Sequence, residues 1–125
     1  MINRKLMHGV VLSSAIALGG CSSIIPSFWD DNEAYGVAKV RHSVDAINCG
    51  GNYMPQVNTL VSDIRFLELY SESKGSDDLS EMVSPMMETA KGLQKMSVNE
   101  TFCKLKKGQL TEQSALIADA AMERF

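Results

Sequence analysis

The feature that most limits how this chain can fold is a series of apolar stripes at helical spacing, separated by residues that end helices. Apolar side chains recur every three or four residues, the spacing that places them on one face of a helix. Gly50 and Gly51 end the first stripe, and the second begins around Tyr53 to Pro55, since proline is tolerated in a first helical turn. The four stripes comprise Val37, Val40, Val44 and Ile47; Val57, Leu60, Val61, Ile64 and Leu67; Leu79, Met82, Val83, Met86, Ala90 and Leu93; and Phe102, Leu105, Leu110, Leu116, Ile117, Ala120 and Ala121.

Polar residues at the ends of these stripes indicate where helices begin and end. Three pairs have the spacing of a capping box: Asp30 with Glu33, Asp78 with Glu81, and Ser97 with Glu100. The polar run 71–76 indicates a loop, and Pro85 is expected to kink or divide the third helix. No stretch after residue 30 alternates for long as a strand does. The pattern therefore predicts an all-α fold, a small antiparallel bundle of about four helices.

The first 20 residues have the layout of a secretory signal. Arg4 and Lys5 are followed by a mostly apolar run from Leu6 to Leu18, and no acidic residue occurs before Asp30. That run is roughly 13 residues long, whereas a membrane-spanning helix needs about 20. A permanent transmembrane helix is therefore the weaker interpretation.

The end of this segment, Leu18-Gly19-Gly20-Cys21, resembles the lipobox of bacterial lipoproteins. The resemblance implies that the Cys21 thiol takes a diacylglycerol, that the peptide is cut before Cys21, and that the new amine is acylated. Ser22, in place of Asp, implies transfer to the periplasmic face of the outer membrane in a Gram-negative envelope. The alternative is an ordinary signal in which Cys21 occurs by chance. The expected organisation is a signal peptide at 1–20, a lipidated tether at 21–29 and a helical periplasmic domain at 30–125.

The charge of the expected mature chain limits the classes of partner that it can attract. Removing Arg4 and Lys5 from the 12 basic residues leaves 10 against 15 acidic ones, a net charge of −5. This acidity argues against a nucleic-acid partner. It also disfavours attraction to acidic phospholipids, so the lipid on Cys21 is expected to provide the anchor.

Two further cysteines, Cys49 and Cys103, are expected to form a disulfide in the oxidising periplasm. Cys49 ends the first expected helix and Cys103 begins the fourth, and in an up-down bundle these ends lie at the same pole. A zinc site would need more ligands than these two and His42 provide, and free structural thiols are the remaining alternative.

The residues offer little chemistry. His42 lies off the apolar stripe of its helix, where a solvated role is the simpler interpretation, and neither a metal set nor a cofactor-binding motif is present. Met82, Met86 and Met87 lie within six residues and allow three interpretations: core packing around Pro85, a copper site, or an adaptable surface for a partner near Pro85 and the run 71–76. We expect that the protein is not an enzyme and binds no cofactor.

Segments 28–33 and 69–75, with Cys49, resemble small lipoproteins of Gram-negative bacteria and of their tailed phages. The expected function is a non-enzymatic helical interaction module, anchored in the outer membrane and binding another envelope protein. The alternative is a phage-encoded lipoprotein that acts in host lysis, as spanin subunits do, or in superinfection exclusion. The low proline content, with Pro26, Pro55 and Pro85, differs from that of spanin lipoproteins.

Overall fold

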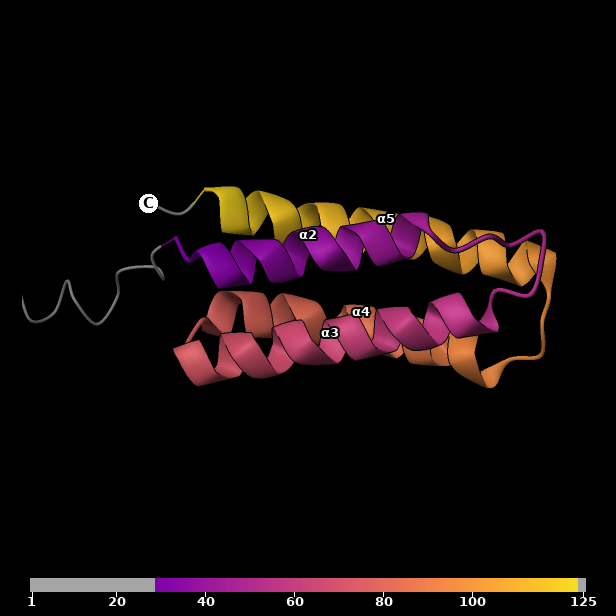
Figure 1. Cartoon of the computed structure of the whole chain (residues 1–125), viewed down its shortest axis with the longest axis horizontal. Coiled ribbons are helices and arrows are strands. Elements are labelled where there is room, and N and C mark those ends of the chain that lie inside the picture. Colours follow the sequence, from indigo (N-terminus) through magenta and orange to yellow (C-terminus); the bar gives the residue numbers. More distant parts are fainter. Residues whose placement is uncertain (1–28, 124–125) are drawn as a thin grey trace, which may run out of the picture.

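The computed structural model describes residues 29–123, which form four helices without a strand (Figure 1). These are α2 (Asp31–Asp45), α3 (Met54–Lys74), α4 (Asp77–Lys95) and α5 (Glu100–Met122). The expected signal peptide, with Leu18, Gly19, Gly20 and Cys21, lies outside the described residues.

The helices form an antiparallel up-down bundle in which each helix packs on two neighbours. α2 and α4 each contact both α3 and α5. α2 begins, α3 turns into α4 and α5 ends at one pole of the bundle (Figure 1). We call this the proximal pole, and the opposite one, with the loops 46–53 and 96–99, the distal pole. The predicted all-α antiparallel bundle is confirmed.

The interior of the bundle follows the predicted stripes on α2, α3 and α4 closely. Their buried apolar side chains include almost every residue of those stripes. The stripe on α5 is partly wrong, because Leu105 and Leu116 are each 60% exposed. Leu110, Ile117 and Ala121 of the predicted stripe are buried, together with the smaller side chains of Cys103, Ser114 and Ala118, which were not predicted.

Two of the three predicted capping boxes do not start a helix. Asp30 does cap α2, and it accepts a 2.9 Å hydrogen bond from the backbone N–H of Glu33. α4 instead begins one residue before Asp78, after Ser76. α5 is capped by Asn99, whose side chain accepts a hydrogen bond from the N–H of Phe102 at 2.8 Å, and Ser97 lies two residues before this cap.

The observed ends of α2 and α3 also differ from the predicted ones. α2 ends at Asp45, well before Gly50, and Ile47 is buried from the following loop. α3 continues through most of the polar run 71–76 to Lys74 and is capped by Gly75, which adopts a left-handed φ of 81°. The predicted loop at 71–76 is therefore wrong, because the buried Ser71 makes a tertiary contact that keeps the helix intact.

Pro85 does not divide α4, which is continuous from Asp77 to Lys95. Pro85 lies on the exposed face of the helix, where its missing N–H leaves no buried group unpaired. The following turn is secured in part by Thr89, whose hydroxyl donates to the Pro85 carbonyl at 3.1 Å.

The predicted disulfide between Cys49 and Cys103 is present at the distal pole, with a Cα–Cα distance of 5.6 Å. Both cysteines are buried. Beside the disulfide, the hydroxyl of the fully buried Tyr53 accepts a 2.7 Å hydrogen bond from the N–H of Asn99. The loop before α3 is thus joined covalently to the first turn of α5 and by a polar contact to the loop that precedes α5.

Candidate functional site

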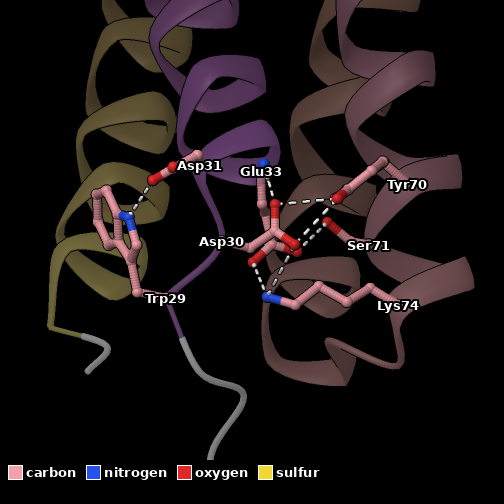
Figure 2. Close-up of polar contacts among 7 residues, drawn as sticks. All are labelled: Trp29, Asp30, Asp31, Glu33, Tyr70, Ser71 and Lys74. Atoms are coloured by element: carbon pink, nitrogen blue, oxygen red, sulfur yellow. Dashed lines mark hydrogen bonds and ion pairs between the residues drawn. The ribbon is translucent and has the colours of Figure 1, made fainter.

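The most organised polar arrangement lies at the proximal pole, where the chain enters α2 (Figure 2). It joins the first turn of α2 to the last two turns of α3. We call it the proximal polar cluster, and its members are Asp30, Glu33, Tyr70, Ser71 and Lys74.

Glu33 forms the buried part of this cluster. Its side chain is turned from the α2 cap into the interface with α3, and the residue is 1% exposed. The Ser71 hydroxyl donates to one carboxylate oxygen at 3.2 Å, and the Lys74 ammonium lies 3.4 Å from the other. A buried carboxylate is tolerated when it is paired and hydrogen-bonded, which is the situation here.

Asp30 forms the outer part of the cluster. The Tyr70 hydroxyl donates to its carboxylate at 2.9 Å, and Lys74 lies 4.0 Å away. The hydrogen bond from the Glu33 N–H holds the pKa of Asp30 below its ordinary value, with help from Tyr70 and Lys74 and against a contribution from burial. At Tyr70, a hydrogen bond with Asn32 lowers the pKa of the phenol, but Asp30 and burial raise it. The pKa of Tyr70 is therefore above its ordinary value.

Trp29 lies beside this cluster without joining it. Its indole N–H donates to Asp31 at 2.7 Å, on the side of the α2 terminus away from Tyr70 and Lys74 (Figure 2). Trp29 is 41% exposed, so the last described residue before the α2 cap presents part of its ring to solvent.

An apolar hollow of about 190 Å³ lies between α2 and α5, close to the proximal pole. Ala34, Val37 and Ala38 line it from α2, and Ala118 and Met122 line it from α5. The small side chains on both helices leave this seam open. Arg41 lies at its edge and is the only charged residue among those that line the hollow.

His42 precedes Ser43, whose hydroxyl bonds directly to the Asp63 carboxylate. It lines a second hollow of about 190 Å³ with Ser43, Ala46, Gln56 and Thr59, between α2 and α3. Asp63 is hydrogen-bonded directly by the Ser43 hydroxyl and lies 3.6 Å from the Lys39 ammonium. A catalytic serine would instead need the histidine between itself and the carboxylate. Here the hydroxyl and the carboxylate hold α2 and α3 together.

The methionines predicted as an adaptable partner surface do not form a surface. Met86 and Met87 are buried in the core, and Met82 is partly buried against it. They pack inward because the apolar stripe of α4 coincides with the face of this helix that meets the core. The partner surface at Met82, Met86 and Met87 is therefore corrected to core packing.

Within residues 29–123, no group of three or more His, Cys, Asp or Glu side chains could hold a metal ion. None of the four described helices is long and apolar enough to cross a membrane. Searched against known protein families, curated proteins and solved structures, the chain matches none.

The proximal polar cluster is not predicted by the sequence pattern. That pattern places Glu33 in a capping box, and Ser71 and Lys74 in a loop. The one available signal is that Tyr70, Ser71 and Lys74 continue the helical register after Leu67, with Ser71 four residues beyond it. A polar residue at a core position of this kind indicates a buried partner on another helix.

Proposed function

We propose that the chain is a lipid-anchored helical module of a Gram-negative envelope, which acts by contact with another envelope protein and not by catalysis. The observation that supports it most is the Leu18-Gly19-Gly20-Cys21 motif, placed nine residues before the helix cap Asp30. The folded bundle thus follows the expected lipid attachment site almost at once. From Cys21 to Trp29 the chain reaches at most about 30 Å, so the bundle would stay near the membrane.

The proximal polar cluster suits this role mechanically. Any load on the anchor enters the fold at Asp30, the first residue that α2 uses for its cap. Asp30 and Glu33 are both linked to α3 through Tyr70, Ser71 and Lys74. The load would therefore be shared by α2 and α3 where the chain enters the fold. This suits a domain that is held at a membrane and presents rigid faces to a partner.

The expected partner surface moves away from the methionines of α4, because those side chains are buried. Outside the core, the apolar hollow between α2 and α5 and the exposed aromatics on α2 and α3 remain on the surface. Tyr35 and Phe66 are the most exposed of these aromatics, and Phe66 stacks on Tyr70 with ring centroids 6.2 Å apart. We place contact with an envelope protein on these faces.

The test is lipidation at Cys21. Mass spectrometry of the protein from envelopes should find an acylated Cys21 at the mature N-terminus. Cys21→Ser should leave the chain unprocessed or soluble, and the control His42→Ala should be processed and anchored as the original is. A Cys21→Ser chain that is still processed and held in the membrane would overturn the proposed function.

A further inference from the structure

The charges of the described residues are divided unevenly between the two poles. The Ser43–Asp63 and Thr89–Gln113 contacts mark the middle of the bundle. The proximal half (29–42, 63–88 and 112–123) contains 13 acidic and 4 basic residues, a net charge of −9. The distal half (43–62 and 89–111) contains 2 acidic and 5 basic residues, a net charge of +3. The acidic average of the chain hides a cationic pole.

The basic residues of the distal half are lysines on the last turns of α4 and the first turns of α5. They are Lys91, Lys95, Lys104, Lys106 and Lys107. One of them has a structural role, because the Lys107 ammonium donates to the carbonyl of Ile47 at 2.8 Å and thereby secures the loop that follows α2. Lys104 lies 3.1 Å from Glu100 in an exposed pair, which contributes little to stability and is easily exchanged for another anion.

Exposed apolar side chains alternate with these lysines along the sequence. Met96, next to Lys95, is 47% exposed, and Val98 in the loop before α5 is 55% exposed. Leu105, between Lys104 and Lys106, is 60% exposed. Lys106 also lies over the Phe102 ring, 5.4 Å from its centroid. We call Lys95, Met96, Val98, Lys104, Leu105 and Lys106 the distal patch.

The distal patch sits on a rigid base. Its loop is fixed at Asn99, which bonds to Tyr53, and its helix is fixed at Cys103, which forms the disulfide. Ordering this surface on binding therefore costs little conformational entropy.

We propose that the distal patch docks on the anionic phospholipid surface of the same membrane that holds the Cys21 anchor. Apolar side chains flanked by lysines match a surface with an apolar interior and phosphate headgroups. Lysine ammonium groups act as separate point charges, whereas a site built for protein carboxylates favours the paired geometry of arginine. Neither hollow described above includes a residue of the distal patch, so neither of them offers a cradle for a peptide side chain there.

The geometry allows the anchor and the distal patch to reach one membrane together. α5 has 23 residues and is therefore about 35 Å long, and the tether spans up to about 30 Å. Because the tether is nearly as long as the bundle, the distal patch can reach the membrane that holds Cys21 while the acidic proximal half stands away from the surface. This inference rests on the proposed function, since the membrane in question is the one that holds the lipid.

The experiment uses the lipidated mature protein in vesicles and a tryptophan at the distal patch. The sequence has one tryptophan, so Trp29→Phe combined with Val98→Trp creates a single reporter. Vesicles of phosphatidylcholine alone, or with one-fifth phosphatidylglycerol, carry brominated acyl chains that quench tryptophan on contact. Trp29→Phe combined with Leu116→Trp places the reporter in the acidic half as a position control.

The expected result is strong quenching of the reporter at position 98 only in vesicles with phosphatidylglycerol, and its loss in about 1 M salt, where charge is screened over about 3 Å. Each lysine near such a surface changes the contact equilibrium about fivefold. Lys95→Gln with Lys106→Gln should thus weaken contact about 25-fold. The matched pair Lys39→Gln with Arg65→Gln removes the same charge from the proximal half and should leave quenching unchanged.

Equal quenching with and without phosphatidylglycerol, or equal loss in both charge pairs, would overturn the docking. So would a reporter that is never quenched yet responds to a glutamate-rich peptide, which would assign the distal patch to an acidic protein. Sedimentation with phosphatidylcholine vesicles separates the two proposals. Failure to sediment contradicts the lipid anchor, whereas sedimentation without quenching contradicts the distal docking alone.

Discussion

Removal of the Cys49–Cys103 disulfide should cost this bundle a large share of its stability. The bond joins residues 54 positions apart and so closes a loop of about 55 residues in the unfolded chain. On the chain-entropy model, closing a loop of that length stabilises the folded state by about 4 kcal/mol at 25 °C. Domains of this size have unfolding free energies of about 5–15 kcal/mol, so the double variant Cys49→Ala with Cys103→Ala should be marginal.

Urea unfolding and thermal unfolding, both followed by circular dichroism, measure this loss of stability. The unfolding free energy should fall by about 4 kcal/mol, and the melting temperature by about 15–30 °C. The dependence on urea should become steeper, because an unfolded chain without the crosslink exposes more surface. A local control is Tyr53→Phe, which removes the hydroxyl bonded to Asn99 at the same pole and should cost about 1 kcal/mol with an unchanged urea dependence.

The predicted contribution of the disulfide would be refuted if the double cysteine variant lost less than about 1 kcal/mol of unfolding free energy and kept the urea dependence of the original protein. That outcome would mean that native packing at the distal pole already restricts the chain as much as the disulfide does. A loss as large as the prediction but with an unchanged urea dependence would assign the effect to the cavity left by two buried sulfur atoms.

Three further variants test the interior and the proximal pole. Asp30→Asn keeps a cap acceptor but removes a carboxylate whose pKa is lowered by folding. The unfolding free energy of the original protein should decline as the pH falls below the ordinary carboxyl pKa of 3.8. The unfolding free energy of the variant should decline less over the same pH range. Lys74→Met withdraws the ammonium from the buried Glu33 and should cost about 2 kcal/mol in chemical unfolding, whereas Lys39→Met at a half-exposed ammonium should cost under about 1 kcal/mol. Met86→Lys places a charge at a fully buried position and should cost on the order of 4 kcal/mol by thermal melting; a variant as stable as the original would return Met86 to the surface.

Local sequence patterns are sufficient to predict the number of helices and most of the core. Val57, Leu60, Ile64 and Leu67 repeat at helical intervals, and a helix that buries one face requires that repeat. The disulfide is predictable because the topology of an up-down bundle brings the end of the first helix to the start of the last. Each of these inferences needs only near neighbours in the chain and a general rule of packing.

The errors occur where distant residues decide between local alternatives. Glu33 has the spacing of a capping residue, but it bonds to Ser71, 38 positions away. The same contact extends α3 through a segment whose composition indicates a loop. On α5, the local pattern favours Leu105 and Leu116 as core, but both are exposed, and Ser114 and Ala118 are buried instead.

The buried Glu33 has a desolvation cost that an apolar residue would avoid, and we infer that its contribution is to specificity. Apolar stripes alone would let α2 slide along α3 by a turn with little change in buried area. Glu33, Ser71 and Lys74 permit one register only, because a shifted carboxylate would be buried without these donors. At the other pole, Cys49 ties the segment after α2 to α5 through Cys103. α2 is thus fixed to α3 where the chain enters the fold and to α5 where α2 leaves it. Under the proposed function, α2 would receive the pull of the membrane anchor, and these two attachments would oppose its shear out of the bundle.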